Sequence, residues 1–241
     1  MIFFNHPDTS DEIIEFGQCH TCKRKLKVLV WNVYKGKRKE FKKEFLQNFS
    51  DCDLFILQEI VTTDAVLDVL KFDENISWVL GSSFEYKHNK IKTGVAIGSR
   101  IPIENPRLVR GTESELLIWT PKVSLMVENK ELDLLIVSTH FVNFTTTNRF
   151  KFFLEELIDK IAHFKGKIIL AGDFNTWSFK RWHQLLTGLE KSGLQHYMFE
   201  QDKRLLKLDH LFFKDIKIDS AQILNTLNGS DHYPMVFEVE I

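Results

Sequence analysis

The sequence has 241 residues, of which 44% are hydrophobic and 27% are charged, with 11 Gly and 5 Pro. This is the composition of a globular chain of one or two domains, and it excludes a mainly disordered, collagen-like or low-complexity protein. The 32 Lys and Arg against 33 Asp and Glu argue against a uniformly basic nucleic-acid-binding protein.

The first 25 residues show no sustained hydrophobic period, and we expect an N-terminal arm (1–25) followed by one domain (26–241). The arm is acidic, whereas residues 23–43 hold ten Lys or Arg and one Glu. Such a basic segment is typical of a solvated face, and beside a site it would attract a polyanion.

The number of cysteines and the length of the apolar runs indicate the cellular compartment in which we expect the protein. Three cysteines do not make a disulfide framework, and the Cys19–Cys22 pair lacks the four ligands of a structural zinc site. No signal segment opens the chain, and no apolar run approaches the roughly 18 residues of a membrane span. We expect a soluble, cytoplasmic protein without stable membrane insertion, and we favour a monomer.

From residue 26 onward, short apolar runs alternate with helical patterns. Nine runs have strand length and β-branched or aromatic content: 27–32, 53–59, 94–99, 122–128, 132–140, 167–173, 210–213, 216–224 and 235–240. Helices are predicted over the Phe41, Phe45 and Phe49 stripe, after an N-cap at Asn148, and around 179–188. Residues 128–130 predict a hairpin turn. Several runs are apolar on both faces, which predicts two packed sheets flanked by helices.

Polar groups stand where these runs end. Four runs finish in polar residues: Asn32, Gln58-Glu59, His140, and Asp173 with Asn175. Two further polar groups precede apolar runs: Asp209, and Ser230-Asp231-His232. If the last two strands run opposite to the first four, all six groups meet at one sheet edge. Functional groups carried on a rigid scaffold are the usual way to build a site.

This ordered set resembles the endonuclease/exonuclease/phosphatase (DNase I-like) superfamily. The matching segments are Trp31-Asn32, Gln58-Glu59, Gly94 to Ile97, Ser138-Thr139-His140, Gly172 to Asn175, Leu208-Asp209 and Ser230-Asp231-His232. Within it the chain looks most like the bacterial YafD-like branch, through residues 30–35, 140–144 and 172–178. The resemblance implies an α+β, four-layer α/β/β/α sandwich with two mixed, mainly antiparallel sheets. It also implies hydrolysis of a phosphate ester assisted by Mg²⁺ or Mn²⁺.

The resemblance also implies roles for the strand-end residues. Asp173 would orient or deprotonate the attacking water, and Asn175 would hold that water or the phosphate. His232 would donate to a phosphate oxygen, Asp209 would pair with His232, and His140 would be a second donor. Because Mg²⁺ prefers oxygen ligands, Glu59 is the first choice of metal ligand, supported by Asn32 and Asp231.

Six further residues are weaker candidates for substrate binding: Lys35, Arg38, Asn143, Arg149, Trp177 and Arg181. Lys35 and Arg38 follow Asn32 and would lie on the rim of the site if the strand ends there. An aromatic ring and an Arg at a phosphate site would stack and clamp a nucleotide. Packing on neighbouring helices would explain four of these residues equally well: Asn143, Arg149, Trp177 and Arg181.

For the substrate, the sequence narrows the choice without settling it. The sequence departs from the signatures of abasic-site endonucleases and of inositol-phosphate 5-phosphatases. These two activities are therefore disfavoured. A phosphodiesterase or nuclease is therefore the first hypothesis, with nucleic acid as one candidate substrate. A phosphomonoesterase acting on a lipid or nucleotide phosphate is the alternative, followed by a catalytically inactive binding module. A nucleic-acid-binding protein using residues 23–43 alone would bind without metal and lose affinity steeply with salt.

Overall fold

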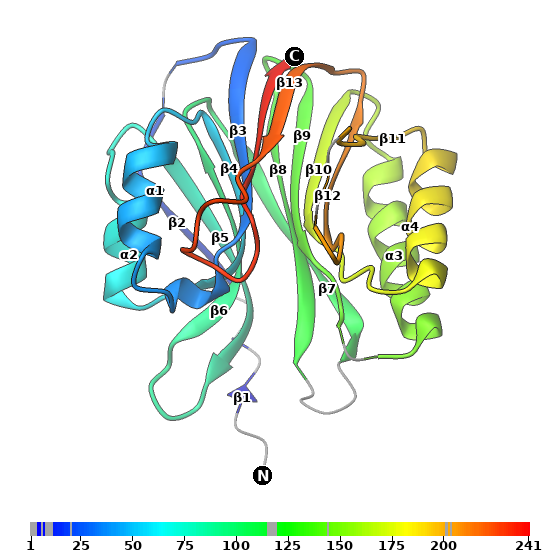
Figure 1. Cartoon of the computed structure of the whole chain (residues 1–241), viewed down its shortest axis with the longest axis horizontal. Coiled ribbons are helices and arrows are strands. Elements are labelled where there is room, and N and C mark those ends of the chain that lie inside the picture. Colours follow the sequence, from blue (N-terminus) through cyan, green and yellow to red (C-terminus); the bar gives the residue numbers. More distant parts are fainter. Residues whose placement is uncertain are drawn as a thin grey trace.

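The computed structural model describes residues 4–5, 7, 12–19, 21–114, 120–143, 145–200, 202 and 204–241. Its strands form two sheets that pack face to face, and two helices cover the outer face of each sheet (Figure 1). This is the four-layer α/β/β/α sandwich that the sequence predicts. Among the described residues, no helix combines the length and apolarity needed to cross a bilayer.

The first sheet runs in the order β1-β5-β6-β4-β3-β14-β13, with β2 also paired to β5. Its strands are β1 (Phe4–Asn5), β2 (Ile13–Phe16), β3 (Lys25–Asn32), β4 (Leu54–Val61), β5 (Ser77–Tyr86), β6 (Lys92–Ser99), β13 (Lys217–Ile223) and β14 (Met235–Glu240). Only β3 and β4 pair in parallel. Strands β1 and β2 come from the predicted arm, so these parts of it extend the sheet at β5.

The second sheet runs in the order β11-β12-β10-β9-β8-β7. Its strands are β7 (Glu104–Ser114), β8 (Pro121–Asn129), β9 (Leu134–His140), β10 (Lys167–Asp173), β11 (Gln195–His196) and β12 (Asp209–Lys214). Strands β9 and β10 pair in parallel and the other pairs are antiparallel. The parallel pair is joined by a helix, because parallel neighbours need a long crossover.

Alternation along β3 shows how the layers form. Val28 and Val30 face the second sheet and belong to the central core, whereas Leu29 and Trp31 face the helical layer. Successive side chains of a strand point to opposite faces, and both faces of β3 are buried. A strand that is apolar throughout therefore needs a covering layer on each side.

The helices supply those outer layers. Helices α1 (Phe41–Phe49) and α2 (Asp64–Leu70) pack on the first sheet, and α3 (Thr147–Ala162) and α4 (Phe179–Lys191) pack on the second (Figure 1). The Phe stripe of α1 is buried as predicted. The predicted cap of α3 is wrong: Thr146, not Asn148, accepts the hydrogen bond from the Arg149 backbone N–H.

Some elements differ from the sequence-based expectation. Strands β5 and β7 and helix α2 were not among the predicted elements. The predicted turn at 128–130 lies slightly later, because β8 continues through Asn129 and the turn occupies 130–133. There the Asn129 side chain accepts a hydrogen bond from the Leu132 backbone N–H (2.7 Å). A turn residue that bonds its own backbone is a common use of Asn.

Candidate active site

The registers of both sheets bring the strand-end residues together. Asn32 lies beside Gln58 in the parallel β3–β4 pair, and Asp173 lies beside His140 in the parallel β9–β10 pair. Strand β12 runs opposite to β10 and places Asp209 across from Asp173. Strand β14 runs opposite to β3, so the loop before it reaches the same edge. The predicted opposition of the last strands to the first four is confirmed.

His232 and Asp209 form the closest charged pair of the site. His232 Nδ1 lies 2.9 and 3.0 Å from the two carboxylate oxygens of Asp209. Burial opposes the charge on His232, but Asp209, with Asp173 and Asp231, raises its pKa to about 10. Burial likewise opposes the charge on Asp209, but His232 and Arg204 hold its pKa below the usual value. The pair is therefore an imidazolium and a carboxylate at neutral pH.

The loop that carries His232 is fixed to strand β3. The Trp31 indole N–H donates to the carbonyl of His232 (2.9 Å), and the Ser230 hydroxyl donates to the carbonyl of Asn32 (2.6 Å). The Ser230 hydroxyl also accepts from the His232 backbone N–H (3.2 Å). These bonds hold the imidazole in place without regular secondary structure.

Asp173 is the most enclosed carboxylate of the site. Its side chain accepts hydrogen bonds from the Asn32 amide (3.0 Å) and the Asn175 backbone N–H (2.9 Å). His232 Nε2 lies 3.8 Å from the same carboxylate. Burial raises the pKa of Asp173 to about 6, against the opposing effect of the His232 charge. A carboxylate with a pKa near neutrality is suited to accept a proton from water.

Asn175 sits on a left-handed turn directly after β10, with φ of 50°. Asn tolerates this conformation better than most residues. Its side-chain amide donates to the carbonyl of Phe141 (2.9 Å), which fixes the side chain beside Asp173. The turn thus holds both polar residues of the Asp173-Phe174-Asn175 segment at the cleft, while Phe174 is buried in the helical layer.

His140 remains neutral at the other side of Asp173. Burial, together with the positive charges of Lys122 and His232, holds the pKa of His140 well below its usual value. His140 Nε2 lies 3.5 Å from the Asp173 carboxylate and 3.4 Å from Lys122 Nζ. Lys122 comes from β8 and was not a predicted site residue, because its position at the start of a strand-like run carries no signal of function.

Glu59 reaches the cleft through an irregularity in β4. The register between β4 and β6 shifts between Gln58 and Ile60, and Glu59 has φ of 56°. Such bulges redirect a side chain and are common beside active sites. Gln58 is buried between the sheets and donates to Ser138 Oγ (3.2 Å), whereas Glu59 lines the cleft. Of this polar pair, only Glu59 faces the cleft.

The donor set at this edge fits a hard divalent cation. Glu59 and Asp231 line the cleft, and Asn32 adds an amide oxygen that accepts a hydrogen bond from the Tyr34 backbone N–H (3.1 Å). Oxygen donors of this kind suit Mg²⁺ or Mn²⁺. Ligand atoms of Asp173, Asp209 and His232 also lie within 4.8 Å of one another. A protonated His232 repels a cation, so the first set is the better fit.

These groups line one cleft of about 320 Å³ at the sheet edge. The predicted residues that line it are Lys35, Glu59, His140, Asn143, Asp173, Asn175, Asp231 and His232. Asn32 and Asp209 do not line the cleft themselves. Asn32 bonds Asp173, and Asp209 bonds His232, and these two partners line it. Lys35 donates to the Tyr86 hydroxyl (3.2 Å) on its rim.

The other weak candidates lie elsewhere in the described structure. Arg38 is exposed and Arg149 begins α3, and neither belongs to the cleft lining. Trp177 lines a neighbouring cavity. Arg181 is 1% exposed and donates to the carbonyls of Val142, Asn143, Thr145 and Asn175. Its guanidinium braces the turns that carry the site, because its donors are directed at backbone and not at the cleft.

The fold and the site define a class of phosphate-ester hydrolases built on a two-sheet sandwich. Residues 29–232 match the Endonuclease/Exonuclease/phosphatase family, and the chain belongs to that family. A curated relative, a UPF0294 protein of Vibrio vulnificus, is 32% identical over 223 residues, covering 88% of this chain and 76% of the relative. The predicted superfamily and its YafD-like branch are confirmed.

Solved structures of different function share the fold. D. rerio TDP2 complexed with a single-strand DNA product has a TM-score of 0.68 at 15% identity, covering 91% of this chain and 100% of that one. A mannosyl-6-phosphatase of Bacteroides thetaiotaomicron has a TM-score of 0.66 at 14% identity, covering 90% and 100%. Family membership supports a hydrolase acting on phosphoric esters. At these identities the structural likeness concerns the fold alone.

Proposed function

We propose that the protein is a phosphodiesterase that cleaves a P–O bond by in-line attack of water and requires Mg²⁺ or Mn²⁺. The observation that carries the proposal is the opposition of two groups at the base of the cleft. Asp173 has a pKa raised to about 6, and His232 has a pKa raised to about 10, with 3.8 Å between the carboxylate and Nε2. One group can accept a proton at neutral pH while the other holds one.

The roles follow from these protonation states. Asp173 takes the proton of the attacking water as the water oxygen bonds to phosphorus, and the ester P–O bond breaks on the opposite side. His232 donates a hydrogen bond from Nε2 to a phosphate oxygen, and Asp209 keeps His232 charged through Nδ1. The leaving oxygen takes up a proton from solvent. Neutral His140 and the Asn175 side chain position the phosphate.

Glu59, Asp231 and Asn32 would hold the divalent ion. When bound, that ion would neutralise phosphate charge and stabilise developing negative charge on oxygen. Its ligands belong to the first sheet and the 230–232 loop, whereas Asp173 and His140 belong to the second sheet. The phosphate would therefore lie between the two sheets.

The side-chain charges of the cleft are balanced: Lys35, Lys122 and protonated His232 are matched by the carboxylates of Glu59, Asp173 and Asp231 among the lining residues. The surplus positive charge would therefore come from the divalent ion alone. A diester, with one negative charge, depends less on that surplus than the dianion of a monoester does. A phosphomonoesterase acting on a lipid or nucleotide phosphate remains the second candidate, because a mannosyl-6-phosphatase shares the fold.

The test is hydrolysis of matched chromogenic esters. Bis(p-nitrophenyl) phosphate and p-nitrophenyl phosphate are compared in Mg²⁺, Mn²⁺ and EDTA, together with single-stranded DNA, double-stranded DNA and RNA. We expect diester cleavage that EDTA and Glu59→Gln abolish. Preference for the monoester would favour the second candidate. No cleavage by folded, metal-supplied protein, with metal binding retained in a titration, would favour the inactive binding module.

A further inference from the structure

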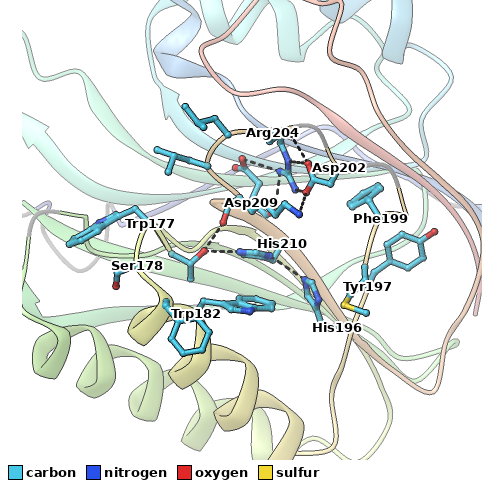
Figure 2. A pocket seen from close by; sticks show the side chains of 16 residues that line it. Trp177, Ser178, Trp182, His196, Tyr197, Phe199, Asp202, Arg204, Asp209 and His210 are labelled. Atoms are coloured by element: carbon cyan, nitrogen blue, oxygen red, sulfur yellow. Dashed lines mark hydrogen bonds and ion pairs between the residues drawn. The ribbon is translucent and has the colours of Figure 1, made fainter.

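A second cavity of about 420 Å³ lies next to the candidate active site, and Figure 2 shows the side chains that line it. The two cavities share the segments at 175–176 and 207–209. Asn175 and Leu208 line the catalytic cleft, whereas their neighbours Thr176 and Lys207 line the second cavity. The two cavities are therefore adjacent, with these two chain segments between them.

Most of the exposed large hydrophobic side chains of the described structure gather at this cavity. Five of the seven line it: Trp177, Phe179, Met198, Leu205 and Leu206. Leu205 is 97% exposed, Phe179 82% and Met198 76%. Scattered apolar residues on a surface need no explanation, but a concentration beside a site marks a binding surface.

The interior of the cavity continues this apolar surface. Trp182 and Phe199 lie on opposite sides of it (Figure 2). Trp182 stacks on His210, with 4.8 Å between ring centroids, and burial lowers the pKa of His210 to about 3. This wall is therefore neutral as well as aromatic. We call the cavity the aromatic pocket, defined by Trp177, Trp182, Phe199 and the exposed rim residues Phe179, Met198 and Leu205.

Most of the polar side chains of the aromatic pocket already have partners. Arg204 makes two short hydrogen bonds to Asp202, and Asp209 is paired with His232. His210 bonds Thr176 through Nε2 (2.7 Å) and His196 through Nδ1 (3.2 Å). The remaining nitrogen of His196 is buried out of reach of solvent. These groups leave few donors or acceptors to read the polar edge of a base, so the pocket selects for apolar surface.

We propose that the aromatic pocket binds a hydrocarbon arm of an amphiphilic phosphodiester while the phosphate occupies the catalytic cleft. This inference rests on the proposed phosphodiesterase function and names its substrate class. Transfer of hydrocarbon from water to the pocket becomes more favourable as more apolar surface is buried. Chain length is therefore the variable to which the pocket responds, whereas the cleft responds only to the phosphate.

The test varies one arm of a chromogenic diester and keeps the p-nitrophenyl arm constant. Methyl, hexyl and decyl p-nitrophenyl phosphates are compared as monomers, beside the p-nitrophenyl ester of thymidine 5′-phosphate. We expect kcat/KM to rise with chain length and to be about ten-fold or more higher for decyl than for methyl. The combined variant Phe179→Ser, Met198→Ser, Leu205→Ser should lower this decyl-to-methyl ratio several-fold.

Phe152→Ser is the matched control. Phe152 is a large exposed hydrophobic residue of α3 that lies outside the pocket lining, and its substitution should leave the ratio unchanged. A ratio that does not depend on chain length, with all esters cleaved, overturns the inference and leaves the proposed function intact. A preference for the thymidine ester that the rim variant removes also overturns it, in favour of a base-binding pocket.

A binding experiment separates this inference from the proposed function. Calorimetric titration with decyl methyl phosphate and with dimethyl phosphate requires no turnover. Tighter binding of the decyl compound, lost in the rim variant and kept in Phe152→Ser, supports the pocket even if no ester is hydrolysed. Equal affinity for the two compounds contradicts the inference whatever the activity.

Discussion

The catalytic cleft and the aromatic pocket are adjacent at the start of β12. The two neighbouring residues there, Asp209 and His210, differ in charge at neutral pH. Asp209 lines the aromatic pocket and pairs with His232 of the catalytic cleft, and it is buried yet charged because His232 and Arg204 provide opposite charge. His210 points to the other face and packs against Trp182 and His196. There burial, with the positive charge of Arg204, keeps it neutral. Burial alone does not determine whether a side chain is charged. The charge depends on which partner lies next to that side chain on its face of the strand.

The largest effect should come from removing the proton acceptor of the cleft. Asp173→Asn keeps the side-chain shape but cannot accept a proton from water, so kcat should fall by about 10²–10⁴-fold. Steady-state kinetics on the best diester measures this loss. Thermal unfolding followed by circular dichroism should show a folded variant. Retention of more than a tenth of the activity would remove Asp173 from its proposed role.

Arg204 connects the two cavities, and its loss should destabilise the fold. Its side chain and that of Asp202 are 7% and 5% exposed, and Arg204 Nη1 lies 3.6 Å from Asp209 Oδ2. Arg204→Met leaves the buried Asp202 carboxylate with only the more distant ammonium of Lys207 (3.8 Å), which should cost about 3 kcal/mol. Denaturant unfolding measures it. Adding Asp202→Asn should restore most of this loss, and failure of that rescue would show that Arg204 acts through some other contact.

Lowering the pH should destabilise the folded protein through His210 on the aromatic side. The pKa of His210 falls from 6.5 to about 3 on folding, so between these values the unfolded chain binds a proton that the folded protein excludes. Stability therefore decreases as pH falls below 6.5, by about 2 kcal/mol at pH 5. His210→Gln should flatten this slope between pH 7 and 5. An unchanged slope would mean that another group controls it.

The smallest expected effect is a difference in KM between substitutions of two basic residues that follow Asn32, namely Lys35 and Arg38. Lys35 lines the catalytic cleft, whereas Arg38 is exposed away from its lining. Lys35→Ala should raise KM by about three- to ten-fold, as expected for one partly exposed charge contact with a phosphate. Arg38→Ala should change KM little. Equal effects of the two substitutions would indicate long-range attraction by the whole basic segment.

The sequence predicts the strand-end residues well because buried strands that end in polar groups are visible as a pattern. Asn32, His140 and Asp173 each follow an apolar run, and the sheet registers then bring them together. Other parts give no such signal. Strand β5 contains Gly81, Ser82 and Ser83, a composition typical of turns, and its pairing with β2 and β6 overrides that local preference.

The missed residues of the site were hidden for a related reason. Lys122 lies at the site through its contact with His140 on the neighbouring strand, and Arg204 through its contact with Asp209, which in turn pairs with His232 of a later loop. Arg181 shows the reverse case. Its position after Asn175 suggests a phosphate clamp, but the carbonyls of two turns take up its guanidinium. Residue type and spacing predict which groups can do chemistry, but only the tertiary contacts determine which way each group faces.

The attachment of the 230–232 loop to β3 has a consequence for the order in which the site is completed. His232 follows every other catalytic candidate in the chain, and its position depends on bonds to Trp31 and Asn32, more than 190 residues earlier. Strand β14, which follows this loop, can pair with β3 only after the strands that lie between them in the sequence have been synthesised. A growing polypeptide on the ribosome therefore lacks the His232 hydrogen-bond donor of its own cleft until the other strands of both sheets have been made.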